Sequence, residues 1–210
     1  MIQATGQRNK KLWTIVLAAG ASSRLGRPKQ LLRISGETLL SRMTRLASKV
    51  SPSRTIVVIG AQAGRMRAHL GRSRIRTLPV HNSAWQTGMG SSLRAGIEAL
   101  PNDAAGVLVM LTDQPGVSMA LIERLLKAWQ RQPNRIVACQ YLGQLGVPAV
   151  FPHRVFGLLR QLDGDRGARA ILKSAQRVVA VDAPNAAHDV DTEADVAALL
   201  KPGAFPDTSC

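Results

Sequence analysis

The stretch LWTIVLAAGASSRLGRPKQLL, residues 12–32, indicates how this chain folds. It begins with an uninterrupted apolar run, Leu12–Ala18, which is typical of a strand covered on both faces. Small residues around Gly20 follow the run, and small residues let a backbone approach a ligand closely. We therefore expect a buried strand that leads directly into a ligand-binding loop.

Apolar runs and segments of helical periodicity alternate along most of the chain. The runs predict strands at 55–60, 75–80 and 106–111, and the periodic segments predict helices at 38–49, 63–70, 91–100 and 119–131. Beyond them we expect strands at 135–141, 146–151 and 177–181, and helices at 154–162, 167–174 and 192–200. This alternation indicates βαβ units, so the predicted fold class is α/β, a three-layer α/β/α domain with a mostly parallel, Rossmann-like sheet.

The composition fits one globular domain. The chain has 210 residues, of which 45% are hydrophobic and 20% are charged, and this excludes an intrinsically disordered chain. Aromatic residues make up only 3%, so the core must be aliphatic, and the aromatic platforms that stack single-stranded bases are mostly missing. A chain of this size buries roughly 70% of its unfolded surface, so its core needs neither a disulfide nor a structural metal.

The positive charge is concentrated in the first 80 residues. The chain carries 28 Lys and Arg against 13 Asp and Glu, and residues 1–80 hold 16 of these bases and one acid, Glu37. This asymmetry suggests an anionic partner, either phosphates or nucleic acid. The alternative is a basic, soluble surface that has no such partner. The scattered bases and scarce aromatics argue against a nucleic-acid-binding protein, although affinity for duplex DNA that survives about 0.5 M salt would support one.

The two cysteines, Cys139 and Cys210, form neither a disulfide framework nor a metal-binding pattern. A reducing compartment, the cytoplasm, is therefore expected. The apolar run that follows Lys10 and Lys11 resembles a signal peptide. The run is too short for one, however, and two cysteines do not form the disulfide framework that is typical of a secreted protein. No run approaches the roughly 20 apolar residues that span a bilayer, so we expect no membrane contact.

Two cations accompany the glycine-rich loop. Arg24 lies within it, and Lys29 follows Pro28 after the loop's second glycine, Gly26. Arginine can hold two phosphate oxygens at once, while lysine acts as a compact charge. The spacing matches neither the dinucleotide motif G-x-G-x-x-G nor a Walker A motif. The loop therefore indicates a phosphate-binding site that follows neither of these two motifs. The alternative is that Arg24 and Lys29 are only solvated charges on the surface.

Acidic residues follow the predicted strand 106–111 and precede the last predicted helix. Asp113 stands just past the carboxyl end of that strand, where α/β folds bind ligands. A carboxylate there suits a divalent cation that bridges phosphates, and the alternative is a residue that forms a turn. Asp189, Asp191 and Asp195 form a second acidic group. The four histidines are scattered without ligand spacing, so metal binding by histidine is not expected.

The segment LAAGASSRLGRPKQLL, residues 17–32, resembles the signature of nucleotidyltransferases that activate small phosphorylated molecules with a nucleoside triphosphate. Further segments match that family in the same order: NSAWQTGMGSSLRAGI at 82–97, LTDQPGVS at 111–118, GVPAVF at 146–151, GDRGARAIL at 164–172 and DVDTEAD at 189–195. Together the matches extend over about residues 12–200. The chain is most similar to the molybdenum cofactor cytidylyltransferases, a group of MobA-like nucleotidyltransferases.

The resemblance implies a fold of the nucleotide-diphospho-sugar transferase type. It also implies an enzyme that moves CMP from CTP to molybdopterin or to the molybdenum cofactor built on it, with Mg²⁺ and release of pyrophosphate. A single nucleotidyltransferase domain is expected over 1–200, with a nucleotide-binding half at 12–115, an acceptor-binding half at 116–200 and a tail at 201–210. A molybdenum hydroxylase or its maturation chaperone is the implied protein partner. The alternatives are GTP in place of CTP, or a sugar or polyol phosphate as acceptor.

The same resemblance assigns residues to roles. Catalysis falls to Arg24, Lys29 and Asp113, with Arg24 at the β- and γ-phosphates and Lys29 at the α-phosphate. The implied metal ligands are Asp113 and Asp191. The implied nucleotide-binding residues are Leu17, Ala18, Ala19, Gly20, Arg24, Lys29, Asn82, Gly90 and Ser92, and the implied acceptor-binding residues are Gly146, Pro148, Asp165, Arg166 and Arg169.

Some of these residues, or their neighbours, have structural alternatives. Ser91 or Ser92 could simply cap the helix that follows. Asp165 and Arg169 could pair across one turn of a helix. Asp195 fits the first turn of the last predicted helix better than a metal site.

The base preference is predicted from one residue. The guanylyl relatives usually carry a second glycine in the loop, as in Leu-Ala-Gly-Gly, where this chain has Ala19 before Gly20. A methyl group there removes space beside the nucleobase, and a purine needs more room than a pyrimidine. We therefore expect CTP to be used in preference to GTP.

Overall fold

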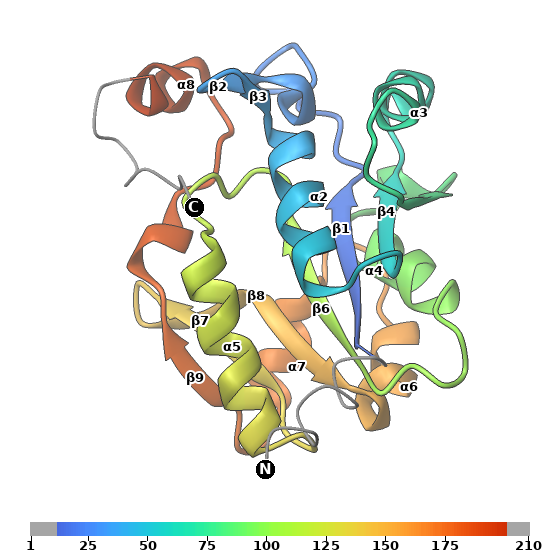
Figure 1. Ribbon diagram of the computed structural model, residues 1–210, viewed down its shortest axis with the longest axis vertical. Helices are drawn as coiled ribbons and strands as arrows, with labels where there is room; N and C mark the ends of the chain where they lie inside the picture. Colours follow the sequence, from blue (N-terminus) through green and yellow to red (C-terminus); the bar gives the residue numbers. More distant parts are fainter. Residues whose placement is uncertain (1–11, 201–210) are drawn as a thin grey trace.

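The computed structural model describes residues 12–200, so the expected tail at 201–210 lies outside the described residues. A seven-stranded sheet forms the centre, in the order β5-β4-β1-β6-β8-β7-β9. The strands are β1 (Leu12–Ala18), β4 (Thr55–Ile59), β5 (Leu78–His81), β6 (Gly106–Leu111), β7 (Val137–Tyr141), β8 (Gln144–Pro152) and β9 (Val179–Asp182). Among these strands β8 alone runs antiparallel to its neighbours, so the expected mostly parallel sheet is confirmed (Figure 1).

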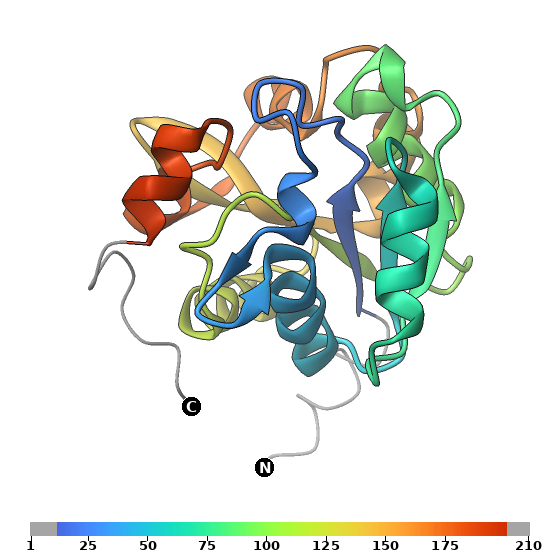
Figure 2. The same ribbon diagram turned by 90° about the horizontal axis from the view of Figure 1, so that it is seen from above.

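Helices cover both faces of the sheet, which confirms the three-layer architecture (Figure 1, Figure 2). Alternation along β1 explains the layers, because Val16 and Ala18 face one helical layer while Ile15 and Leu17 face the other. The first layer holds α2 (Leu39–Val50), α3 (Ala63–Gly71) and α5 (Met119–Arg131), and the second holds α4 (Met89–Glu98), α6 (Phe156–Arg160) and α7 (Ala168–Ser174). Both cores are mainly aliphatic, as the composition predicts.

A small third cluster joins early and late parts of the chain. After β1 and its loop come a 3₁₀ turn, η1 (Lys29–Leu31), and a hairpin of β2 (Arg33–Ile34) and β3 (Glu37–Thr38). Leu25 and Leu32 share a buried cluster with Val190 and Leu199, and Leu199 ends the last helix, α8 (Glu193–Leu199). Figure 1 shows α8 beside β2 and β3 at the top of the molecule. This packing brings the loop after β1 next to the acidic residues before α8.

Several expected elements differ in their bounds. The strand expected at 75–80 is β5, Leu78–His81, an edge strand that pairs with β4. Its side chains are exposed or half-buried throughout, so the apolar run that marks the buried strands is missing here. The helix expected at 91–100 begins earlier, at Met89, and the strand expected at 177–181 is shifted to β9. No helix in residues 12–200 is long and apolar enough to cross a membrane.

Candidate active site

The glycine-rich loop lies at the carboxyl end of β1 and is closed by hydrogen bonds of its own. The N–H groups of Leu25 and Gly26 each donate to the Ser22 carbonyl oxygen at 3.1 Å, and the Lys29 N–H donates to the Ser22 hydroxyl at 3.1 Å. Gly26 has φ +68°, a left-handed conformation that favours glycine. The loop therefore turns back on itself and places Lys29 over the end of the sheet.

Gln30 ties this loop to the strand beneath it. Its side chain is buried, and its amide nitrogen donates to the carbonyl oxygens of Ala18 at 3.2 Å and Gly20 at 2.8 Å. Sequence reasoning did not single out Gln30, because a glutamine after Pro-Lys has no distinctive chemistry of its own. Its contribution depends on a fold that brings residues 18 and 30 together.

Four charged residues from three distant segments meet at this edge of the sheet. Nζ of Lys29 lies 2.6 Å from Oδ2 of Asp113 and 2.8 Å from Oδ1 of Asp191. A terminal nitrogen of the Arg24 guanidinium lies 2.7 Å from Oδ2 of Asp191. The side chains of Lys29 and Asp113 are only 13% and 17% exposed, whereas that of Arg24 is 69% exposed. The structure thus brings together the residues that the sequence assigns to catalysis and metal binding.

Opposite charges keep Lys29 and Asp191 ionised. Burial alone would lower the pKa of Lys29, but the carboxylates of Asp113 and Asp191 outweigh it and hold that pKa above its usual value. Burial would raise the pKa of Asp191, but Lys29 and Arg24 outweigh it and hold that pKa below its usual value. The balance is reversed at Asp189, where burial, and then the charges of Asp113 and Asp191, raise the pKa to about 6.

The two carboxylates of the cluster fit a divalent cation. Oδ1 of Asp113 is buried and has no hydrogen-bond partner among the described residues, so one carboxylate oxygen is left for another ligand. The ammonium of Lys29 already lies between Asp113 and Asp191. Within residues 12–200 no group of three or more His, Cys, Asp and Glu side chains is arranged to hold a metal. Two carboxylates suit a hard cation that completes its coordination with water and phosphate oxygens.

Asp195 belongs to the capping box of α8. Its Oδ2 accepts hydrogen bonds from the N–H groups of Thr192 at 2.7 Å and Asp191 at 3.0 Å, and its own N–H donates to the Thr192 hydroxyl at 3.3 Å. The bonds from Asp191 and Thr192 lower the pKa of Asp195. The expected role at the helix terminus is confirmed, and the same cap fixes the backbone of Asp191.

Two cavities lie side by side next to the charged cluster. The first cavity has a volume of about 370 Å³ and includes Lys29 and Asp113 in its lining, and the second has a volume of about 210 Å³. Both are lined by Met89, Leu111 and Asp165, so the cavities adjoin at these three residues, which form the shared wall between them. Groups held in the two cavities would therefore lie close to each other beside the shared wall and the charged cluster.

Five of the predicted nucleotide-binding residues line the first cavity, and four do not. Those that line it are Leu17, Ala19, Gly20, Lys29 and Ser92. Ala18 faces the opposite side of the sheet, in the core that includes α2, and Arg24 lies on the exposed rim. Asn82 is buried, and its amide nitrogen donates to the hydroxyls of Ser91 at 2.9 Å and Ser92 at 3.0 Å. Asn82 therefore supports Ser92 from behind rather than facing the cavity.

The amino end of α4 packs against the loop 163–167. The Gly90 N–H donates to the Gly164 carbonyl oxygen at 2.9 Å, so it is not free to meet a nucleotide. Gly88 has φ +120°, and a Cβ there would overlap the backbone of Gly164. Gly88 is also the N-cap of α4, and the Ser91 hydroxyl donates to its carbonyl oxygen at 2.8 Å. Neither Ser91 nor Ser92 is therefore the N-cap of α4, the structural role that the sequence allowed for them.

Two of the five predicted acceptor residues line the second cavity, and three do not. Asp165 and Arg169 line it, while Gly146, Pro148 and Arg166 do not, although Val147 between the first two does. Asp165 precedes α7, which begins at Ala168, so Asp165 and Arg169 do not pair across a helical turn.

Other lining residues were missed by sequence reasoning. Trp85 lines the first cavity, and Gln114 and Tyr141 line the second. Trp85 and Gln114 fall inside segments that resemble the family, and this resemblance was the available signal. Oε1 of Gln114 is buried without a hydrogen-bond partner among the described residues, while its amide nitrogen donates to Ala186 O at 3.0 Å.

Comparison with known proteins gives relatives that extend along most of the chain, and nicotine blue oxidoreductase is among them. Over 201 residues, 35% are identical to nicotine blue oxidoreductase of Paenarthrobacter nicotinovorans, and the match covers 89% of this chain and 95% of the relative.

Solved structures give the same fold. The crystal structure of Rv0371c from Mycobacterium tuberculosis H37Rv has a TM-score of 0.75 and 32% identity, and the match covers 91% of this chain and 97% of that one. A structure of Rv0371C in complex with manganese has a TM-score of 0.72 and 30% identity, with coverage of 91% and 99%. The architecture is therefore the α/β nucleotide-diphospho-sugar transferase fold.

The model of one family matches most of the sequence. It is described as the MobA-like NTP transferase domain and matches residues 14–181, a range that contains the glycine-rich loop, Asp113 and the wall between the cavities. The fold, the site and this match agree, and the chain belongs to the family of MobA-like NTP transferase domains.

Proposed function

We propose that this protein transfers CMP from CTP to the phosphate of molybdopterin, with Mg²⁺ bound, and releases pyrophosphate. The observation that carries the proposal is the cluster of Arg24, Lys29, Asp113 and Asp191 beside the wall between the two cavities. Two anionic groups must approach each other in this reaction, so catalysis depends on neutralising charge and aligning the reactants.

In the proposed reaction an oxygen of the acceptor phosphate attacks the α-phosphorus of CTP, and the bond to the β-phosphate oxygen breaks. Lys29 neutralises charge at the α-phosphate, and the exposed Arg24 holds the β- and γ-phosphates that leave as pyrophosphate. Both cations exchange a carboxylate for phosphate oxygens when the triphosphate binds. Asp113 and Asp191 would hold Mg²⁺, which adds positive charge at the phosphates.

The first cavity is the proposed nucleotide site. Leu17, Ala19, Gly20 and Ser92 line it together with Lys29, which supports placing the nucleoside there. The methyl group of Ala19 takes space that a purine would need, and one methyl in a pocket changes kcat/KM by roughly 10- to 200-fold. CTP is therefore the proposed donor.

The second cavity is the proposed acceptor site. Met89, Leu111 and Val147 line it with apolar side chains, and Asp165 and Arg169 add polar ones, which suits a ring that carries polar groups. Arg166, Gly146 and Pro148 remain proposed neighbours of the acceptor. A molybdenum hydroxylase or its maturation chaperone would take the product. We place the reaction in the cytoplasm because Cys139 is a free buried thiol.

The test is pyrophosphate release with CTP or GTP, with Mg²⁺ or Mn²⁺, and with molybdopterin, a sugar phosphate or a polyol phosphate as acceptor. We expect turnover with molybdopterin and a higher kcat/KM for CTP than for GTP. Equal values, or a preference for GTP, would overturn the cytidylyl assignment. Turnover with only a sugar or polyol phosphate would show that this molecule, rather than molybdopterin, is the acceptor. The proposal of nucleotidyl transfer would still stand.

A second candidate function comes from the 35% identity to nicotine blue oxidoreductase over 95% of that protein. The paired carboxylates and cations beside the first cavity favour phosphate chemistry instead. The same preparation, supplied with a reduced nicotinamide cofactor as the electron donor, should therefore be assayed for reduction of nicotine blue, followed by the absorbance of the dye. Reduction of the dye without any pyrophosphate release would replace the transferase proposal.

A further inference from the structure

We propose that Trp85 forms the surface on which the nucleobase stacks in the first cavity, an inference that rests on the proposed use of a nucleoside triphosphate. Trp85 begins a short 3₁₀ turn, η2 (Trp85–Thr87), between β5 and α4. Among the described residues that line the first cavity, it supplies the aromatic ring.

The position of Trp85 is set by a glycine at the end of β4. A Cβ on Gly60 would lie 2.5 Å from Cβ and 2.8 Å from Cγ of Trp85, and 2.9 Å from Cβ of Ala19. The absence of a side chain at Gly60 therefore makes room for Trp85 beside Ala19. Ala19 also lines the first cavity, so Trp85 and the residue proposed to limit the size of the base both line this cavity and both lie next to Gly60.

The backbone around Trp85 is held by the turn that carries it. Oδ1 of Asn82 accepts a hydrogen bond from the Ala84 N–H at 3.0 Å, and the Gly88 N–H donates to the Trp85 carbonyl oxygen at 3.2 Å. The amide nitrogen of the same Asn82 donates to the Ser92 hydroxyl at 3.0 Å. Asn82 thus fixes Trp85 and Ser92 relative to each other, which gives this buried residue a positioning role.

The lining of the first cavity separates a phosphate end from a base end. Gly20, Ala21 and Lys29 come from the glycine-rich loop, while Trp85 and Ser92 come from the segment before and within α4. A triphosphate on the loop leaves its nucleoside to the second segment. Every base has an aromatic face, so stacking on Trp85 adds affinity for any base, and the choice between bases falls to Ala19.

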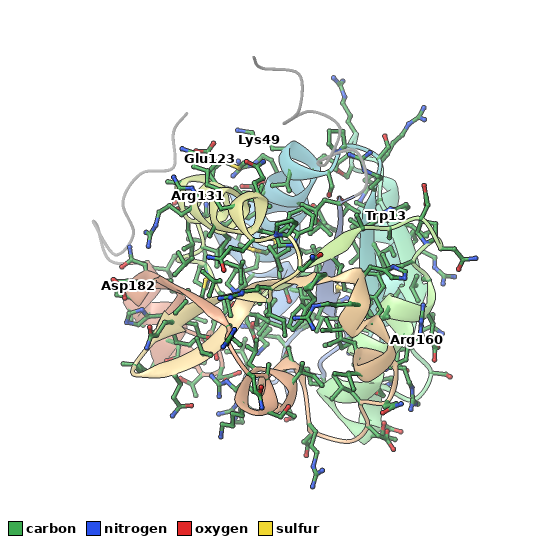
Figure 3. The ribbon with its side chains drawn as sticks, turned by 90° about the horizontal axis from the view of Figure 1, so that it is seen from below. Trp13, Lys49, Glu123, Arg131, Arg160 and Asp182 are labelled. Atoms are coloured by element: carbon green, nitrogen blue, oxygen red, sulfur yellow. The ribbon has the colours of Figure 1, made fainter. Side chains whose placement is uncertain are left out.

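Tryptophan fluorescence provides a direct test, because Trp85 is one of three tryptophans in the chain. Trp129 is buried under β6 and β8 on the side of α5, and Trp13 lies at the amino end of β1. Figure 3 labels Trp13 in the view from below, and the glycine-rich loop follows the carboxyl end of β1, so Trp13 lies at the other end of that strand. Trp13→Phe is therefore the matched control for Trp85→Phe. The probes are CTP, GTP and pyrophosphate, each with Mg²⁺.

We expect CTP to change the fluorescence of the unmodified protein and of Trp13→Phe, but not of Trp85→Phe. In calorimetric titrations Trp85→Ala should bind CTP and GTP roughly 5- to 150-fold more weakly, the scale of one base stacked on an aromatic ring, while Trp85→Phe keeps most of the affinity. Pyrophosphate, which has no base, should bind all variants equally. A melting temperature measured for each variant checks that the fold is intact.

Two results would overturn the role of Trp85. One is an unchanged dissociation constant for CTP in Trp85→Ala, and the other is an equal loss of CTP and pyrophosphate binding. Both leave nucleotide binding by the unmodified protein in place. If the unmodified protein binds neither CTP nor GTP by calorimetry, the proposed function itself fails, and the inference fails with it.

Discussion

Lys29 has two carboxylate partners, and these are the two residues proposed to hold the metal. The positive charge of the lysine therefore offsets part of the negative charge of Asp113 and Asp191. Removing one negative charge from this cluster should affect the reaction far more than the fold, because Asp191 still pairs with Lys29.

Asp113→Asn is expected to lower kcat by at least about 10²-fold, the scale of removing one well-placed electrostatic group. The melting temperature should change little, since the substitution keeps the shape of the side chain. Steady-state pyrophosphate release measures the effect. Asp103→Asn is the control, because Asp103 is exposed in the turn before β6, the strand that Asp113 follows. Near-normal turnover in Asp113→Asn would contradict the metal assignment.

Cys139 lies fully buried in β7, and burial raises the pKa of its thiol to about 12. The thiolate is the reactive form, and at pH 8 its share is of order 10⁻⁴. We expect iodoacetamide to leave Cys139 unmodified in the folded protein and to modify it in denaturant, as measured by the mass of the peptide that carries it. Rapid modification of the folded protein would show that this strand opens.

The residues of the charged cluster could be predicted from the sequence, because Arg24, Lys29 and Asp113 stand next to the predicted first and fourth strands. Roles that depend on tertiary neighbours could not. Gln30 and Trp85 have ordinary sequence surroundings, and their contacts with residues 18, 20 and 60 appear only when the strands are assembled. Asn82 was assigned to the nucleotide, whereas its amide is occupied by two serine hydroxyls.

The contact between α4 and the loop 163–167 is a backbone-to-backbone contact, so it depends on glycine at its centre. In Gly88→Ala the new methyl group would overlap the backbone of Gly164, and the residue would also be strained at φ +120°. We expect a loss of about 1–3 kcal/mol in the free energy of unfolding in urea, together with a higher KM for the acceptor.

Gly64→Ala in α3 is the matched control for Gly88→Ala. No heavy atom lies within 4 Å of a Cβ built at Gly64, and alanine favours a helix interior by about 0.5–1 kcal/mol. The control should therefore be neutral or stabilising. An equally small effect of Gly88→Ala would mean that the loop 163–167 moves away without cost.

The capping box of α8 links helix stability to the position of Asp191. Asp195→Ala removes the acceptor for the Asp191 and Thr192 N–H groups, so we expect a lower kcat with only a small fall in melting temperature. Glu193→Ala is the control, because Glu193 is exposed and pairs with Arg27 on the surface, where ion pairs contribute little. Equal kcat values for the two variants would mean that Asp195 does not position Asp191 for the reaction.

Elements with strong local signals were predicted, and elements without them were not. The strands β1, β4 and β6 are buried apolar runs. Ser118 is the N-cap of α5, where its hydroxyl accepts a hydrogen bond from the Leu121 N–H, a role that is typical of a serine before a helix. The hairpin of β2 and β3 was missed because each strand has only two residues, too few for a periodic pattern.

At the scale of the whole molecule, one sheet connects the site to both cores, so a bound ligand should stabilise the entire fold. CTP with Mg²⁺ at about 100 times its dissociation constant should raise the melting temperature by roughly 5 to 10 °C. A chelator, or Asp113→Asn, should reduce the shift. Scanning calorimetry gives the measurement. A shift that EDTA leaves unchanged would argue that the metal plays no part in nucleotide binding.

Met89, Leu111 and Asp165 line both cavities, so the two cavities adjoin. A molecule that tethers a pyrimidine nucleoside to a planar ring through a short linker would therefore occupy both cavities at once. Its second half would bind as an intramolecular event, so its affinity could exceed that of either half by about 10²- to 10⁴-fold. Bisubstrate compounds of this kind are the natural starting point for a selective inhibitor.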